Sequence, residues 1–354
     1  RWTLNQLPAP GPIVAASASA ASGNAQFFVL SAGRTLVQVS ASGKEIARRE
    51  LPIPDGTVAS IVSRWAEANT AERWAIAGPT LPEVLILDAQ FQVVGRVARA
   101  KSNNAPGAAV EVAWTDIEGD GRPELLVLDA PAGGAAGKLS LFDASGERLR
   151  ADPGGRLDKS PTGSPLEFSA RWLATASPVA PMSAAYASNN AGPQPWIAWF
   201  GDDQTRPTRI GVDGRLSPPI DIGSWRLQRA FVASFPPESA SKVAAIAVSD
   251  TSRPALVAFN VQLKENWNYP LPAAAGELPS EPIRSALLFV EREPFWVLAG
   301  ADGTVHLISA DGSFSDYFSV GEPITGLTTV RYDGNALVVV ATAREVTAWS
   351  FERP

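Results

Sequence analysis

Cysteine is absent from the 354 residues, and histidine occurs once. Without cysteine the chain forms no disulfides, thiolate metal sites or cysteine nucleophiles. A lone histidine cannot build a histidine metal cluster, and no Ser-His-Asp arrangement is signalled. We therefore expect His306 to have a structural or surface role.

Long apolar runs and strong positive charge are also missing. The longest apolar runs, such as 336–343, are far shorter than the roughly 18 residues that span a bilayer. The formal net charge is -6, and Arg48-Arg49 is the one adjacent basic pair of note. Such a chain lacks the electrostatic footprint of a nucleic-acid-binding protein, so we do not expect a nucleic-acid partner.

The remaining composition describes a chain with ample core. Hydrophobic residues make up 45% and charged residues 19% of the sequence, which argues against disorder. The chain begins at Arg1 instead of Met, which fits either a mature chain after removal of a signal peptide or lipoprotein leader or a trimmed chain. Together with the acidic balance and the scarcity of lysine, this favours an extracytoplasmic (periplasmic or secreted) location.

Repetition is the strongest signal in the sequence. Seven segments share a strand-length apolar pattern that ends in a turn, at intervals of about 40 to 70 residues, as in blade repeats. They lie at 35–44, 82–90, 138–147, 208–215, 255–264, 304–313 and 345–352. Each is preceded by a continuous apolar run, which indicates strands buried on both faces.

This pattern predicts an all-β fold, a single domain over 1–354. Blades of four antiparallel strands stacked around a channel bury both faces and protect the sheet edges. We predict a seven-bladed β-propeller of four-stranded antiparallel blades, closed by pairing of the N- and C-terminal strands. The predicted blades are 9–55, 56–104, 105–160, 161–224, 225–276, 277–321, and 322–354 completed by 1–8.

The meander also predicts where the loops lie. Loops between strands one and two of every blade fall on one face. The acidic turn 116–124 of the third blade and the long insert 177–195 of the fourth should therefore be neighbours on one rim. The Gly/Pro/Ser-rich segment 151–165 is expected to join two blades on the opposite face.

The acidic turn has a pattern suited to a hard cation. Oxygen donors recur at alternate positions: the side chains of Asp116, Glu118 and Asp120, the carbonyl of Arg122, and Glu124 after a further step. Gly121 permits the sharp turn, and the spacing can wrap the chain around Ca²⁺. The alternative is a solvated acidic turn without an ion. A bound ion would brace the loop and would not catalyse.

This turn resembles the calcium loops of FG-GAP and related VCBS propeller repeats. In those repeats a similar aspartate series precedes a strand like the one that begins at Glu124. The resemblance implies a structural Ca²⁺ and covers one blade. The sequence departs from the family in having Glu at 118 and 124, where Asp or Asn is usual.

A second resemblance is to the quinoprotein-like propeller repeat. It rests on 308–313 and on 259–267, where a turn after the third strand leads to a fourth strand bearing Trp267. The resemblance implies a Trp that docks between blades. Scaffold proteins share this pattern with dehydrogenases that bind pyrroloquinoline quinone, and we find no cysteine pair and no convergent Glu, Asn and Asp set for a metal-quinone site.

Few ionisable side chains are suited to proton transfer, which favours a non-catalytic scaffold. We predict protein–protein contacts, in a subunit of an envelope or membrane-associated complex. The proline-bearing insert 177–195 is the predicted contact, through Pro181, Met182, Tyr186, Asn189 and Asn190. The alternatives are a metal-dependent lactonase-like hydrolase or lyase, a quinoprotein dehydrogenase, and a carbohydrate-binding propeller that uses some of the eleven Trp residues.

Overall fold

The fold is described by a computed structural model. It describes residues 2–4, 7–15, 25–66, 70–99, 109–131, 136–151, 157–158, 164–176, 197–202, 206–211, 215–232, 243–248, 254–259, 264–271, 284–290, 293–300, 302–313 and 315–351. Every element assigned within these residues is a β-strand. No helix in them is long and apolar enough to cross a membrane.

Six four-stranded antiparallel sheets account for most of the strands. The first three are β2 (Pro10–Ala15), β3 (Gln26–Ser31), β4 (Thr35–Ser40) and β5 (Glu45–Glu50); β6 (Ile61–Trp65), β7 (Arg73–Ala77), β8 (Glu83–Asp88) and β9 (Val93–Ala98); and β10 (Ala109–Thr115), β11 (Glu124–Ala130), β12 (Gly137–Phe142) and β16 (Glu167–Ala170). The others are β20 (Arg226–Val232), β21 (Val243–Val248), β22 (Pro254–Phe259) and β23 (Glu265–Pro270); β24 (Ser285–Val290), β25 (Glu293–Ala299), β26 (Thr304–Ser309) and β27 (Ser315–Ser319); and β28 (Ile324–Tyr332), β29 (Asn335–Thr342), β30 (Val346–Phe351) and β1 (Trp2–Leu4).

The prediction of seven four-stranded blades is wrong, because the described residues form six. Within the described residues, the sheet that stands in place of the blade predicted at 161–224 has three strands, β17 (Leu173–Ala176), β18 (Ile197–Gly201) and β19 (Pro207–Ile210). After β19 the chain makes isolated hydrogen bonds, from the Ser217 amide to the Arg209 carbonyl and from the Ile220 amide to the Pro207 carbonyl. Between them lie Pro218 and Pro219, which have no amide hydrogen to donate, so no regular fourth strand forms there.

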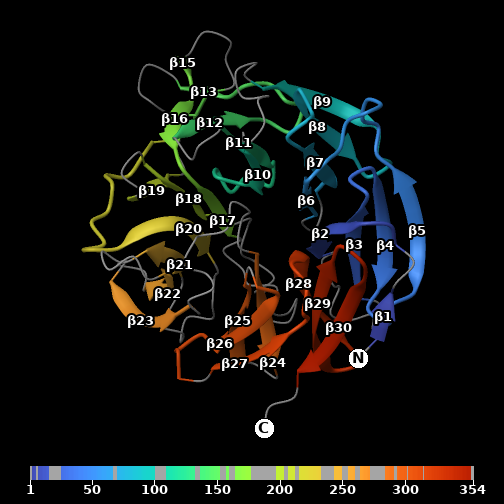
Figure 1. Ribbon diagram of the computed structural model, residues 1–354. Coiled ribbons are helices and arrows are strands. Elements are labelled where there is room, and N and C mark those ends of the chain that lie inside the picture. The colour runs from blue at the N-terminus through green and yellow to red at the C-terminus, as the bar shows by residue number, and fades with distance from the viewer. Residues whose placement is uncertain are drawn as a thin grey trace.

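The sheets form a ring, as Figure 1 shows, with the first strands β2, β6, β10 and β28 toward its centre and β5, β9 and β23 outside. First strands of neighbouring sheets contact each other in the order β28, β2, β6, β10, β17 and β20, and β24 contacts β28. Separate apolar clusters fill the seams between sheets. Trp65 and Trp114 share one such cluster, and both side chains are buried. The large rings therefore fill space between sheets, as expected of a wedge-shaped seam.

The two ends of the chain meet in one sheet. β1 pairs antiparallel with β30, with Trp2 opposite Ala348 and Leu4 opposite Val346. The last sheet therefore takes its outer strand from the start of the chain, which covers an edge that β30 would otherwise expose.

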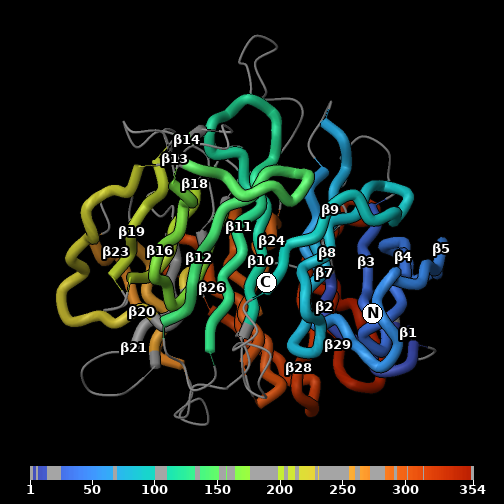
Figure 2. The backbone as a smooth tube through the Cα atoms, turned by 90° about the horizontal axis from the view of Figure 1, so that it is seen from above, coloured from blue at the N-terminus to red at the C-terminus, as the bar shows by residue number. Residues whose placement is uncertain are grey.

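A second correction concerns residues 151–165. β16 pairs with β12, from Gly137 opposite Ala170 to Ser140 opposite Glu167. The segment therefore connects two strands of one sheet, whereas we expected it to join two blades on the opposite face. It contains a small sheet of β13 (Arg150–Ala151), β14 (Leu157–Asp158) and β15 (Ser164–Pro165). In the perpendicular view β13 and β14 lie at one face of the ring (Figure 2).

Register places that small sheet on the face that carries the acidic turn. Leu125, next to the turn, lies opposite Phe142 at the end of β12, where the connection to β13 begins. Residues 167–170, which open the blade predicted at 161–224, form instead the fourth strand of the preceding sheet. A short strand that ends near a buried aromatic residue has the same sequence pattern in both positions.

Candidate functional site

The acidic turn joins β10 to β11, two buried neighbouring strands that hold its two ends in register. Thr115 lies directly opposite Glu124 across these strands. Ile117 is fully buried in the cluster that also contains Leu173 and Phe200 of the adjoining three-stranded sheet. The turn is thus anchored in the seam between two sheets, while Glu118 and Arg122 are exposed.

Carboxylate groups organise the backbone of this turn. The Asp120 amide donates to Asp116 Oδ1 at 3.0 Å, and the Gly121 amide donates to Asp116 Oδ2 at 2.9 Å. Gly121 has a φ of 80°, in the left-handed region where glycine is favoured. The Ile117 amide donates to Glu124 Oε2 at 2.8 Å, which closes the base of the turn.

Three of the five predicted ligands come together. Asp116, Asp120 and Glu124 offer oxygen atoms that all lie within 4.8 Å of one another. Ca²⁺ takes oxygen ligands at 2.3–2.6 Å, so ligands of one ion are at most about 5 Å apart. The spacing of the three carboxylates therefore fits Ca²⁺. Glu118 does not join this group, and Arg122 contributes its amide to Asp120 Oδ1 at 2.8 Å.

Burial makes two of these carboxyl groups unusual, because Asp116 is 2% exposed and Glu124 is 1% exposed. Burial raises the pKa of Glu124 to about 8, opposed by the hydrogen bond from Ile117 and reinforced by the negative charges of Asp116, Glu118 and Asp120. The Thr115 hydroxyl is also buried and has no hydrogen-bond partner among the described residues. Directly opposed residues share one face of a sheet, so this unused oxygen lies on the same face as the Glu124 carboxyl.

Of the other residues singled out in the sequence, the structure describes His306 but not the predicted contact residues. The predicted contact residues Pro181, Met182, Tyr186, Asn189 and Asn190, in the connection between β17 and β18, lie outside the described residues. His306 lies on β26, in a different sheet from the acidic turn, and its side chain is buried. Sequence reasoning missed its neighbour Tyr269 on β23, since a contact between two repeats leaves no signal within either.

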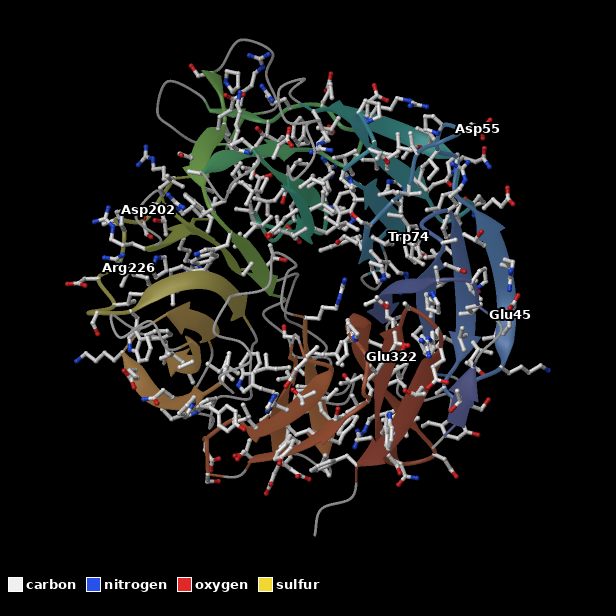
Figure 3. The ribbon with its side chains drawn as sticks, viewed as in Figure 1. Glu45, Asp55, Trp74, Asp202, Arg226 and Glu322 are labelled. Carbon is white, nitrogen blue, oxygen red and sulfur yellow. The ribbon has the colours of Figure 1, made fainter. Side chains whose placement is uncertain are left out.

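Five aspartates outside this turn cap hairpins. Asp88, Asp143, Asp202, Asp302 and Asp311 each accept an amide hydrogen bond from their own turn. Figure 3 shows Glu45, Asp55 and Asp202 around the outside of the ring. Within the described residues, the cluster at 116–124 is the one group of three or more side chains arranged to hold a metal ion.

Comparisons with known proteins match the chain only at the level of fold. No protein-family model and no curated protein matches it. Among solved structures it is similar to BBS1N in complex with ARL6DN (TM-score 0.60, 13% identity, covering 100% of this chain and 96% of that one). It is also similar to the Dos1 propeller (0.52, 9%, 93% and 76%) and to Chaetomium thermophilum Raptor (0.58, 11%, 99% and 28%).

These similarities, at identities of 9 to 13%, establish the fold alone. Together with the ring of sheets they identify an all-β propeller of four-stranded antiparallel blades, with six such blades and not seven. They bear on neither the FG-GAP/VCBS-like calcium loop nor the quinoprotein-like repeats, and both stay predictions.

Proposed function

We propose that this propeller is a non-catalytic scaffold that binds another protein through the face bearing the acidic turn. The observation that carries the proposal is the use of ionisable side chains. The aspartates of five hairpins cap their own turns, and the single histidine is enclosed between two sheets. Such groups stabilise the disc and leave its loops to make contacts.

The comparisons support a protein partner. BBS1N was solved in complex with a second protein, ARL6DN, and its fold covers the whole of this chain. A propeller of this kind offers a rigid face, so its loops are held in place before a partner arrives, which lowers the entropic cost of binding.

The competing enzyme hypothesis makes a different structural demand. A metal-dependent lactonase-like hydrolase or lyase needs acidic side chains from several blades that converge on one ion. In the described residues the metal-type cluster comes from one loop of one blade. This arrangement favours an ion that braces the loop.

We also propose that Asp116, Asp120 and Glu124 bind a structural Ca²⁺, with the Thr115 hydroxyl as a further oxygen. Addition of millimolar Ca²⁺ to the EDTA-treated protein should raise its Tm, because a ligand that binds only the folded state stabilises it. The rise should disappear in Glu124→Gln and Asp116→Asn. Asp88→Asn, which alters a turn-capping aspartate outside the cluster, should keep it. An equal rise in all four proteins would contradict the site.

The contact face can be tested with point variants. Tyr332 is 39% exposed at the end of β28, and so lies on the face of the strand-one-to-strand-two loops, as do Glu118 and Arg122. Replacement of Tyr332 by Ser, or of Glu118 and Arg122 by Ala, should reduce recovery of a stoichiometric partner with the tagged chain from its source cells. Ile46→Ser, on the outer strand β5, is the matched control. Equal recovery in all variants would exclude this face.

The insert and the location stay parts of this proposal. Substitution of Met182 and Tyr186 by Ser tests the predicted contact directly, with the same recovery assay. An extracytoplasmic location, as part of an envelope or membrane-associated complex, is supported by composition alone. Fractionation of the source cells, with recovery in the cytoplasmic fraction as the contradicting result, tests it.

A further inference from the structure

The seam between the sheet β20–β23 and the sheet β24–β27 is mainly apolar. Its core consists of buried Leu256, Trp296, Leu298 and Ile308, against which Trp267 and Tyr269 pack. Trp267 reaches across the seam, where its indole Nε1 donates to the Ala310 carbonyl at 2.9 Å. The seam is therefore held by apolar packing and by a few side chains that cross it.

One polar chain crosses the same seam. The Tyr269 hydroxyl on β23 lies 3.3 Å from Nδ1 of His306 on β26. The other ring nitrogen, Nε2, lies 2.9 Å from the Thr304 hydroxyl, which donates to Asp302 Oδ1 at 2.5 Å. The histidine is 3% exposed, so it depends on these partners and not on water.

The direction of these hydrogen bonds follows from the carboxylate at the end. Because the Thr304 hydroxyl donates its hydrogen bond to Asp302, the Thr304 oxygen is left to accept a hydrogen bond from His306 Nε2–H. A neutral imidazole then has its lone pair on Nδ1, where the Tyr269 hydroxyl donates. The hydrogen bonds that link Tyr269, His306, Thr304 and Asp302 are therefore all formed when the imidazole of His306 is neutral.

We propose that His306 is a pH-operated latch between these two blades, closed when its imidazole is neutral and released when the imidazole is protonated. Protonation turns Nδ1 into a donor, so Nδ1 can no longer accept the hydrogen bond from the Tyr269 hydroxyl. It also places a positive charge in an apolar seam, and the ring reduces this cost by moving outward.

The surroundings of His306 contain little to hold that charge. Its cross-strand neighbours are Leu298 on β25 and Tyr317 on β27, and the Tyr317 ring stacks on it at 6.0 Å between centroids. The neighbouring blade contributes Tyr269. Asp302, in the turn just before β26, is the acidic group that acts on it. The other acidic residues on the flanking strands are exposed: Glu265, Glu293 and Asp316.

The pKa of His306 agrees with a latch that is closed at neutral pH. Burial lowers the pKa of His306 from its usual 6.5, and the attraction of Asp302 only partly opposes this. The unfolded chain therefore takes up the proton first as the pH falls. The latch contributes its full stability above about pH 6.5 and loses it as the pH falls through the lower pKa of the folded state.

The single histidine makes the test direct in the full-length protein. The imidazole Cε1 proton should titrate by NMR with a midpoint below 6.5. Hydrogen exchange of peptides from β23 and β26, corrected for the intrinsic effect of pH, should speed up with that same midpoint. Peptides from β3 and β8, in the blades of another seam, should show no such step.

Variants separate the latch from general acid effects. His306→Phe keeps an aromatic ring in the seam and should abolish the step in exchange. Tyr269→Phe removes the crossing hydroxyl, and at pH 7.5 it should already show the faster exchange that the wild type shows in acid. Tyr332→Phe, an exposed tyrosine on β28, should behave as the wild type does. If His306→Phe does not fold, Tyr269→Phe decides. Unchanged exchange in the wild type across the His306 titration, or slow exchange in Tyr269→Phe, would overturn the proposal.

Discussion

At the residue scale, two buried threonine hydroxyls can be compared, one with a proposed role in cation binding and one without such a role. Thr115 and Thr208 have hydroxyl groups that are buried and without a hydrogen-bond partner among the described residues. An unsatisfied buried group costs about 1–3 kcal/mol. The first lies opposite Glu124 at the proposed cation site, whereas the second lies on β19. Only the first has a proposed role that offsets its cost.

Replacement of each threonine by valine should distinguish these roles. Both Thr115→Val and Thr208→Val should raise the free energy of unfolding of the calcium-free protein by about 1 kcal/mol, since each removes a buried unsatisfied hydroxyl. Only Thr115→Val should reduce the Ca²⁺-dependent rise in Tm. Urea unfolding and thermal scans measure the two effects. A full calcium response in Thr115→Val would remove Thr115 from the site.

At the element scale, side chains that cross from one sheet to the next fix the ring. Arg99, just after β9, is 6% exposed and donates from Nε and Nη2 to Asp129 Oδ1 on β11, at 3.1 and 2.9 Å. Its Nη1 donates to the carbonyls of Gly78 and Leu81. One guanidinium thus joins the connection between β7 and β8 to the neighbouring blade.

Loss of this arginine should be costly. Arg99→Ala removes one partner of a buried ion pair, so we expect it to lower the free energy of unfolding by about 3–5 kcal/mol. Arg96→Ala is the matched control, because Arg96, on β9, pairs with Glu83 at the surface and should cost about 0–1 kcal/mol. Chemical denaturation measures both. Equal losses would show that the buried pair does not brace the seam.

Elements also show how far the sequence predicts the fold. The strand that carries the repeat pattern lies where expected in every unit, for example at β8 and β26, because its apolar run and its turn are local signals. The fourth strands are less predictable. β16 is recognised as a fourth strand only by its pairing with β12. The two prolines after β19 prevent a regular fourth strand, but the sequence alone does not show that they lie at the fourth-strand position of the repeat.

In the candidate sites too, features set by local sequence could be predicted, and features set by packing between strands and blades could not. Asp116, Asp120 and Glu124 could be predicted because their spacing along one turn brings them together. The bridge from Tyr269 to His306 could not, since 37 residues separate its ends and only the stacking of two blades joins them. Burial of Glu124, which raises its pKa to about 8, also depends on tertiary packing that the acidic sequence does not indicate.

At the scale of the whole molecule, a rigid ring held by seams presents two loop-bearing faces and an outer rim. The face with the acidic turn also bears the small sheet β13–β15 and the end of β28. A scaffold should therefore contact its partner on this face, whereas an enzyme acts on a small substrate without a permanent partner.

The most direct test is the mass of the protein isolated under native conditions from its source, combined with cross-links to whatever accompanies it. The scaffold account predicts a defined complex heavier than the 37.3 kDa chain, with cross-links at 116–124 and near Tyr332. A 37.3 kDa monomer at high concentration that hydrolyses small lactones would contradict it.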